Sequence, residues 1–406
     1  MPKKKREGIS MAAKIWKLLS LVFIAIFAAS AVNTVHAAAT QLATPPSISV
    51  GNWARYVAYD SGKGEIFESS GGSGGTSVVN VISDSTNSVV ATITTIPGPG
   101  ALAYDSGKGE VFVMSQNGGP VSVISDSTNT VVTSITVVGG TEGIVYDSGK
   151  GEIFAANSDN TVSVISDSTN AVVATVNVGS NPTCLAYDSG KGEIFVSNEA
   201  AGSVSVISDS NNQVVATITT GSAPFGLAFD SGKGEVFVAD YPASAFSVIS
   251  DKTNTVLTEV AIENYGAPSS NMYEMCYDSG TGHVFVNSDY SAVDIISDKN
   301  NAVTGYIEVT NPSGYATLQG EMAYDSGKGE MFIGGASSDV VYYLSDSSSP
   351  STSSTSSPSA TSASASPTPT IPEFGGGALI LVASAMVVVS VCAVALIVRK
   401  RRQSRQ

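Results

Sequence analysis

The sequence has little of three residue types that would each favour a particular class of protein. Three of its 406 residues are cysteines, so a disulfide framework does not hold the chain together. Only one of its two histidines, His283, lies beyond residue 37, so a multi-histidine metal or haem site cannot be built there, and we expect no metal and no cofactor. Residues 38–398 hold nine basic side chains against 34 acidic ones, a formal charge of −25 that repels nucleic acid.

The N-terminus has the pattern of a secretory signal. Residues 1–17 carry six basic side chains, and an apolar run follows them. Small residues around Ala37 suit a signal peptidase, so we predict a signal peptide over 1–37 and a short leader over 38–45. An uncleaved N-terminal anchor and a start at Met11 are the alternatives.

The C-terminus has the pattern of a membrane anchor. Residues 347–371 are almost entirely Ser, Thr, Pro and Ala and predict an extended stalk. Residues 378–398 carry no charge over a length that suits a transmembrane helix, and the basic tail 399–406 is expected in the cytoplasm. Both ends agree on one topology: the part between them is secreted across the cytoplasmic membrane, anchored to it, and extracellular.

One heptapeptide recurs seven times. YDSGKGE begins at Tyr59 and returns at spacings of 45, 42, 41, 42, 48 and 47 residues, with FDSGKGE at Phe229 and YDSGTGH at Tyr277. Periods above 40 residues belong to propellers or to helical arrays. Each unit holds four short runs rich in Val, Ile and aromatic residues, separated by turn residues. This pattern indicates four antiparallel strands, and hence one propeller blade per unit.

Residues 46–346 are therefore predicted to form an all-β, seven-bladed β-propeller. The last unit lacks its fourth strand, whereas residues 47–50 precede the first unit as a surplus strand. The glycine after this strand stands nine residues before Asp60, as Gly179 does before Asp188. The shared register predicts that the N-terminal strand completes the seventh blade and closes the ring, which removes exposed sheet edges.

The two most regular segments of each unit read as turns. The heptapeptide is expected to form the turn between the first and second strands (the inner turn), with its Lys and Glu solvated. SDSTN or SDKTN, as at Ser83, forms the turn between the third and fourth strands (the outer turn). Both turns then lie on one face of the ring, the turn face, and the irregular loops lie on the other, the loop face. Cys184 and Cys276 fall on inner strands and are expected in the core.

Function is expected where the repeat symmetry breaks, on the loop face. Trp53 and Arg55 are the only Trp and Arg within 38–398, and such residues are enriched among interface anchors. Trp53 is equally suited to plug the mouth of the channel. The candidate ligand- or partner-binding residues are Trp53, Arg55, Glu142, Phe225, Tyr241, Tyr265, Tyr273, Glu274 and Tyr315.

Two kinds of chemistry compete with simple binding. A carboxylate site for a lyase or hydrolase could form at the channel mouth from Glu142, Glu263, Glu274 and Glu321. However, no Ser/His/Asp set is visible and His283 falls in an inner turn, so we predict no catalytic residues and no enzyme. The repeated turn aspartates invite calcium, but the Lys between the acids of DSGKGE argues against a tight site.

The repeat resembles that of the YVTN-type β-propeller proteins of archaeal and bacterial surfaces. The segment that names the family corresponds to FVSN at Phe195 and to FAAN at Phe154, and VSVISDSTNAVVATVNVG (162–179) is similar to its second half-repeat. The likeness covers about residues 46–346. It implies a surface-layer-associated or adhesive protein whose partner is a surface glycan or protein.

A second resemblance precedes the predicted span. Within 372–377, the residues Pro372, Glu373, Phe374 and Gly375 are similar to the PEF-type sorting signals that archaeosortases cut. A plain single-span anchor is the alternative. The sequence thus predicts a cell-surface-anchored propeller that acts as a binding, adhesion or surface-layer-associated module, or else as a structural surface-layer tile without a ligand.

Overall fold

The computed structural model of the protein describes most of the repeat region. The described residues are 40–42, 45–51, 53–71, 77–116, 118–139, 141–220, 223–241, 245–262, 272–288, 292–308, 320–335 and 339–345, without the side chains of 40–42, 141, 142, 272, 273, 288 and 308. The predicted signal peptide, stalk, sorting motif, membrane span and tail lie outside them. Within the described ranges, no helix has the length and apolar character needed to cross a membrane.

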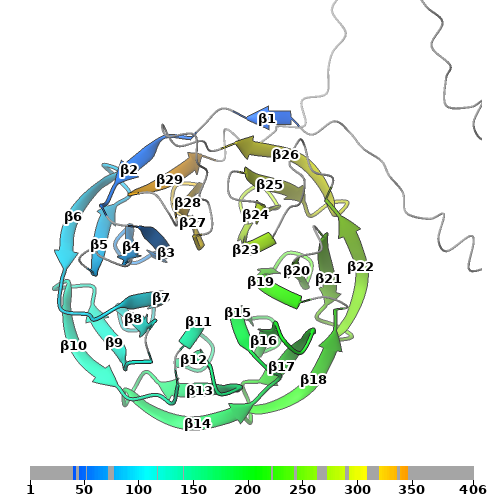
Figure 1. Cartoon of the computed structure of the whole chain (residues 1–406), viewed down its shortest axis with the longest axis horizontal. Helices are drawn as coiled ribbons and strands as arrows, with labels where there is room; N and C mark the ends of the chain where they lie inside the picture. The colour runs from blue at the N-terminus through cyan, green and yellow to red at the C-terminus, as the bar shows by residue number, and fades with distance from the viewer. Residues whose placement is uncertain are drawn as a thin grey trace, which may run out of the picture. The chain divides into compact units, whose positions relative to one another are not determined.

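Seven four-stranded antiparallel units stand around a central axis (Figure 1). In blades one to six the strands follow one another in sequence from the axis outward, as the repeat predicts. Blade one contains β3 (Ala54–Asp60), β4 (Glu65–Ser70), β5 (Val78–Ser83) and β6 (Ser88–Ile93). Blade two contains β7 (Pro99–Asp105), β8 (Glu110–Ser115), β9 (Val121–Ser125) and β10 (Thr130–Ile135). Blade three contains β11 (Thr141–Asp147), β12 (Glu152–Asn157), β13 (Thr161–Ser166) and β14 (Ala171–Asn177).

The remaining blades repeat this arrangement. Blade four contains β15 (Pro182–Asp188), β16 (Glu193–Asn198), β17 (Ser203–Ser208) and β18 (Gln213–Thr219). Blade five contains β19 (Ala223–Asp230), β20 (Glu235–Tyr241), β21 (Ala245–Ser250) and β22 (Thr255–Ala261). Blade six contains β23 (Met272–Asp278), β24 (His283–Ser288), β25 (Ala292–Ser297) and β26 (Ala302–Glu308). Blade seven contains β27 (Met322–Asp325), β28 (Glu330–Gly334) and β29 (Val340–Ser345), and its fourth strand is β2 (Ser47–Ser49).

The N-terminal strand closes the ring, as the register predicts. In β2, Ile48 is paired with Val341 of β29, and the two strands run antiparallel. A further strand, β1 (Thr40–Leu42), adds in parallel to the outer edge of β26, in the neighbouring blade. The sequence did not predict β1, because three residues without alternation give no strand signal.

The inner strands begin earlier than the sequence indicated. Glu142 and Phe225, expected among the irregular loops of the loop face, belong to the first residues of β11 and β19. The register of the inner pair shifts near this point in blades one to six, for example between Pro182 and Leu185 in β15. Such a β-bulge adds a residue to one strand without ending the ladder. The loop face is therefore more regular than predicted.

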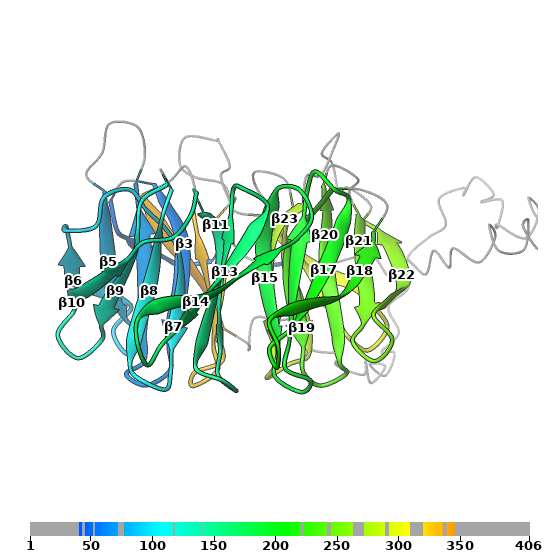
Figure 2. The ribbon, with the colours of Figure 1, turned by 90° about the horizontal axis from the view of Figure 1, so that it is seen from below.

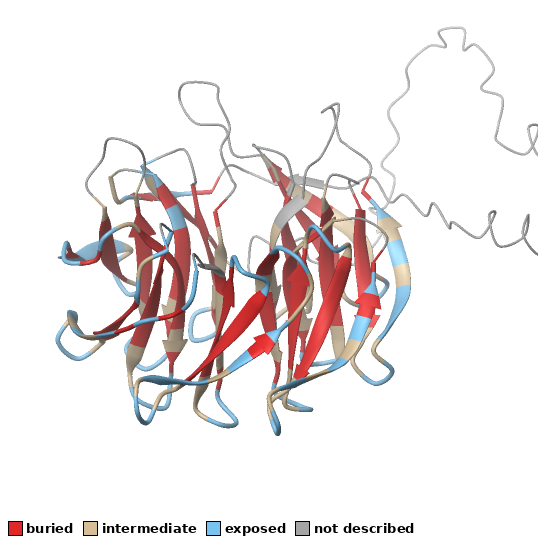
Figure 3. Cartoon of the chain, turned by 60° about the horizontal axis from the view of Figure 1, so that its bottom comes forward, coloured by how far each residue is buried: buried red, intermediate tan, exposed pale blue. Residues whose placement is uncertain are grey.

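Buried side chains concentrate on the second and third strands of each blade, and the outermost strands are largely exposed (Figure 3). One phenylalanine per blade occupies the same position on the second strand and is almost completely buried: Phe67, Phe112, Phe154, Phe195, Phe237, Phe285 and Phe332. Because a large apolar side chain contributes about 1.5–3 kcal/mol on burial, this repeated residue is a main source of the core.

The repeated lysine is exposed, as predicted, and it also joins neighbouring blades. The Lys63 ammonium donates to the backbone carbonyl of Asp126, in the outer turn of the next blade. The same contact recurs as Lys108–Asp167, Lys150–Asp209, Lys191–Asp251, Lys233–Asp298 and Lys328–Asp84. Inner and outer turns thus lie together on the turn face, at the lower edge of Figure 2.

The repeated tyrosine reaches in the opposite direction. The Tyr104 hydroxyl interacts with Asp60 and with the backbone of Gly62 in the preceding blade. Asp60 is fully buried, and its Oδ1 accepts the backbone N–H groups of Gly62 at 2.8 Å and of Lys63 at 3.1 Å. The equivalent pairs are Tyr146–Asp105, Tyr187–Asp147, Tyr277–Asp230 and Tyr59–Asp325. The heptapeptide therefore forms a turn and also joins neighbouring blades. We call the contact between its aspartate and the tyrosine of the next blade the latch.

Both cysteines are free and only half-buried, although the sequence placed them in the core. Each lies on an inner strand, and each packs only at the border of an apolar cluster. Burial raises the pKa of Cys276 to about 12. A thiol with such a pKa stays protonated at neutral pH, which makes it an unreactive packing residue.

Candidate functional site at the channel mouth

Every inner strand begins at the loop face, so the residues at these starts surround the axis there. Four polar side chains come from four different blades: Arg55 on β3, Cys184 on β15, Glu274 on β23, and Glu321 directly before β27. We call these four residues the mouth cluster. Arg55 is exposed, and the other three are half-buried.

Contacts and charge connect the mouth cluster across the ring. The Cys184 thiol donates a long hydrogen bond, of 3.9 Å, to Glu274 Oε2. The positive charge of the Arg55 guanidinium lowers the pKa of both Glu274 and Glu321. The Arg55 Cζ lies 5.0 Å from the centre of the Tyr56 ring. The Arg55 carbonyl accepts the backbone N–H of Glu321 at 2.7 Å. Charged groups of both signs thus meet at one end of the channel.

Folding raises the pKa of both glutamates. Burial raises the pKa of Glu274, and the charge of Arg55 opposes that rise. The pKa of Glu321 is raised further, by burial and then by the Glu274 carboxylate. Burial, followed by the Glu274 carboxylate, raises the pKa of Cys184, so the thiol does not serve as a nucleophile at neutral pH. The arrangement can accept hydrogen bonds, exchange a proton and attract a polar ligand.

Trp53 lies at the seam between blades seven and one. Its side chain is 48% exposed and its φ is 50°, a backbone conformation that bulky residues rarely adopt. Asp339 holds this conformation: its Oδ1 accepts the Trp53 N–H at 3.3 Å, and its carbonyl accepts the N–H of Val50 at 2.9 Å. A strained, exposed tryptophan is a candidate for a contact that the fold itself does not use.

The other sequence-predicted residues are spread over the loop face. Phe225 is half-buried at the start of β19, and its carbonyl accepts the Ser197 hydroxyl at 2.6 Å. Tyr241 ends β20, one strand out from the axis. Glu142 and Tyr273 belong to β11 and β23, but their side chains are outside the described part. Tyr265, Tyr315 and Glu263 also lie outside it. The structure therefore brings together Arg55 and Glu274.

Sequence reasoning had assigned Cys184 to the core and had grouped Glu321 only with other acids. The available signal was position: both residues stand at or just before the first residues of an inner strand. The convergence itself was not readable, because Cys184 and Glu274 are 90 residues apart in the chain.

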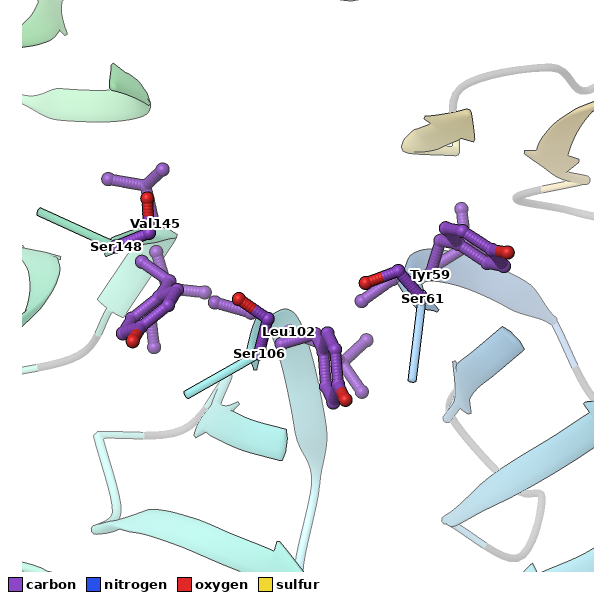
Figure 4. Close-up of a pocket in the computed structure, with 12 residues that line it drawn as sticks. Tyr59, Ser61, Leu102, Ser106, Val145 and Ser148 are labelled. Atoms are coloured by element: carbon purple, nitrogen blue, oxygen red, sulfur yellow. The ribbon is translucent and has the colours of Figure 1, made fainter. Parts of the chain in front are cut away.

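The opposite end of the channel has a different chemistry. There the ends of β3, β7 and β11 surround an open hollow of about 420 Å³. Figure 4 shows Ser61, Ser106 and Ser148 from three successive blades around it, with Leu102 and Val145 beside them. No charged side chain lines this hollow. Among the residues with described side chains, no group of three or more His, Cys, Asp or Glu is placed to hold a metal ion.

Substituting Glu274 by glutamine is expected to change how stability depends on pH. A carboxyl group whose pKa is raised by folding binds its proton more tightly in the native state. The free energy of unfolding therefore falls as pH rises from about 4.5 toward neutrality, and Glu274→Gln removes this contribution. Denaturant titrations should show the variant gaining stability relative to the wild type between pH 4.5 and pH 8. A difference that does not vary with pH would contradict the burial of this carboxyl group.

Comparisons with known proteins support the fold. No protein family matches the chain, and no curated protein matches it either. Among solved structures, a chain of Kuenenia stuttgartiensis hydrazine synthase is similar with a TM-score of 0.63 and 13% sequence identity, over 77% of this chain and 98% of that one. At such low identity the likeness concerns the fold alone. The protein is thus a seven-bladed β-propeller, an architecture that suits a binding or structural role.

Proposed function

We propose that the protein is a cell-surface module that binds a surface glycan or a protein through its loop face, without catalysis. The observation that carries this proposal is the mouth cluster, where Arg55 meets two half-buried carboxyl groups at the axis. Strained and exposed Trp53 adds an aromatic anchor on the same face. Aromatic and arginine residues of this kind supply much of the energy of protein recognition.

The sequence supplies the surface location in this proposal. The predicted signal peptide, Ser/Thr/Pro stalk, span and basic tail indicate an extracellular propeller anchored in the membrane. The resemblance to YVTN-type repeats favours an archaeal surface-layer-associated protein. The PEFG segment favours processing by an archaeosortase-like enzyme.

The proposed anchor also directs the loop face outward. β29 ends at Ser345, which pairs with Glu330 beside the inner turn, so the chain leaves the ring on the turn face. The predicted stalk follows directly. A ring tethered on that side presents its loop face away from the membrane, where a partner can reach Trp53 and Arg55.

The binding proposal can be tested with a glycan array and the purified protein. We expect selective retention of a glycan or a surface protein, and Trp53→Ala or Arg55→Ala should each weaken it by about tenfold or more. Ser106→Ala, on the turn face, is the matched control and should leave it unchanged. Retention that neither loop-face variant reduces would place the partner elsewhere.

A structural tile without a ligand is the second candidate, and the outer rim favours it. One exposed aliphatic side chain occupies the same position on five consecutive outermost strands: Val90, Val132, Val173, Val215 and Leu257. Repeated apolar side chains on an exposed rim suit lateral association between copies. Analytical ultracentrifugation, together with the glycan array, separates the candidates. A tile self-associates as its concentration rises and retains no glycan, whereas the proposed binding module does not self-associate and retains its partner.

A further inference from the structure

The mouth cluster is built from β-bulges. In blade one the register of β3 shifts between Ala54 and Tyr56, so Arg55 is an extra residue without a partner on β4. Cys184 in β15 and Glu274 in β23 lie within the equivalent shifts of blades four and six. A bulge changes the direction in which a side chain leaves its strand, and bulges are frequent beside binding sites. The bulges therefore direct these side chains to one end of the axis, around which β3, β15 and β23 stand (Figure 1).

Arg55 is the only basic residue that the range 38–398 contributes to the loop face. The other basic side chains of this range are eight lysines, and all of them belong to turns of the turn face. Six are in inner turns and two in outer turns: Lys63, Lys108, Lys150, Lys191, Lys233, Lys328, Lys252 and Lys299. The positive charge of the loop face is thus concentrated at one point beside the channel.

The Arg55 guanidinium is available to a ligand. The side chain is exposed, and its guanidinium forms no hydrogen bond or ion pair with the residues that the structure describes. Its Cζ lies 5.0 Å from the centre of the Tyr56 ring, and this buried ring helps to orient the planar group. An oriented guanidinium presents two parallel N–H donors, which match the two oxygens of a carboxylate.

The charges around Arg55 favour a ligand with a single negative charge. Burial raises the pKa of Glu274 to about 7, so this carboxyl group is about half protonated at pH 7. When protonated, it donates a hydrogen bond to an anion instead of repelling it. The groups that face it are Arg55, Cys184 and Glu321, and the start of β19 beside it carries no charge. Since residues 38–398 carry a formal charge of −25, a carboxylate is favoured over a doubly charged phosphate.

Trp53 supplies an aromatic surface next to Arg55. The two exposed residues flank the buried Ala54, so their Cα atoms are at most about 7 Å apart. An exposed indole ring packs against the C–H face of a sugar ring, whose hydroxyl groups can stay in water. A ligand that combines a sugar ring with a carboxylate therefore matches this pair of side chains.

We propose that the mouth cluster binds a uronic acid residue of an acidic glycan. Arg55 donates two hydrogen bonds to the sugar carboxylate, protonated Glu274 donates a further one to the same group, and the sugar ring packs on Trp53. An acidic peptide would offer Arg55 a carboxylate but would give Trp53 no sugar ring. The inference rests on the function proposed for the loop face, and it names the class of ligand that binds there.

The test is calorimetric titration of the full chain, in a detergent without sugar groups, with the methyl glycosides of glucuronate and galacturonate. Their matched controls are the methyl glycosides of glucose and galactose, which have a hydroxymethyl group in place of the carboxylate. At least one uronate should bind saturably and about tenfold or more tighter than its neutral control. Equal affinity for both members of each pair, or binding of neither uronate, would overturn the proposal.

Two variants that each remove one positive charge locate the site. Arg55→Gln should weaken binding of the uronate about tenfold or more, because the carboxylate loses its paired donors. Lys252→Gln, on the turn face, is the matched control and should leave the affinity unchanged. Both side chains are exposed, so neither variant should melt lower than the wild type. Equal effects of the two variants would mean that the uronate responds to overall charge, and the site would then be wrong.

The pH dependence of binding tests the part given to Glu274. The protonated fraction of a group with a pKa of about 7 rises about tenfold from pH 8 to pH 6. The affinity for the uronate should therefore rise by up to about tenfold over this range. Glu274→Gln is neutral at every pH, so it should bind with the same affinity at pH 6 and pH 8. A pH dependence that persists in this variant would contradict proton uptake by Glu274.

Failure of this inference can be distinguished from failure of the proposed function on the glycan array. A neutral glycan retained through Trp53 and Arg55 would overturn the inference and leave the proposed function intact. An acidic peptide that binds through Arg55, with no uronate bound, would do the same. Retention of no glycan and no surface protein would overturn both.

Discussion

Replacing Ile48 by aspartate is expected to destabilise the propeller by about 3–5 kcal/mol, because it buries an unpaired charge at the only place where the ring is closed by the N-terminus. Ile48 is 5% exposed and belongs to one apolar cluster with Phe332 and Val341 of blade seven and Ile66 of blade one. The substitution removes this contact and weakens the pairing of β2 with β29. Denaturant unfolding of the purified protein measures the effect.

Ser49→Asp is the control, because it places the same charge one residue away on the exposed side of the same strand. It should change the free energy of unfolding by no more than about 0.5 kcal/mol. Deletion of residues 38–51 should reproduce the Ile48→Asp result and should also make unfolding less cooperative, since β29 becomes a free edge. Equal stability of the two point variants would mean that the ring does not depend on β2.

The seven blades and the closure of the ring could be predicted because they depend on local signals. Each inner turn is one copy of a heptapeptide, and four runs of β-branched residues separated by turn residues specify four strands. Closure followed from counting from a glycine to Asp60. These signals involve residues close together in sequence, where spacing and conformation are directly linked.

The side-chain contacts between blades could not be predicted in the same way. Lys63 and Asp126 are 63 residues apart, and nothing in a single repeat tells which neighbouring blade its lysine reaches. For the same reason the sequence placed Cys184 in the core and did not associate it with Glu274. Phe229 was visible as a departure from the heptapeptide, but its consequence for Asp188 requires the direction in which the tyrosines point.

The latch makes the inner-turn aspartates unequal, although they occupy the same position in the repeat. Asp105 accepts the N–H groups of Gly107 at 2.8 Å and of Lys108 at 3.2 Å, and the Tyr146 hydroxyl interacts with it from the next blade. Asp188 accepts the equivalent pair of N–H groups but has Phe229 in place of the tyrosine. The two residues therefore form a matched pair that differs by one hydroxyl.

Asp105→Ala is accordingly expected to cost about 3 kcal/mol or more, because it removes the carboxylate acceptor of two backbone N–H groups and one hydroxyl. Asp188→Ala leaves only the two N–H groups, because Phe229 has no hydroxyl. Both substitutions remove an Oδ2 that has no hydrogen-bond partner among the described residues. It should cost less than Asp105→Ala by about 1–2 kcal/mol. Denaturant unfolding of both variants measures the difference, and Ser106→Ala, an exposed change in the same inner turn as Asp105, is the control. Equal costs for the two aspartates would mean that the tyrosine hydroxyl contributes nothing to the latch, and that blades are joined through the lysine contacts and the apolar core alone.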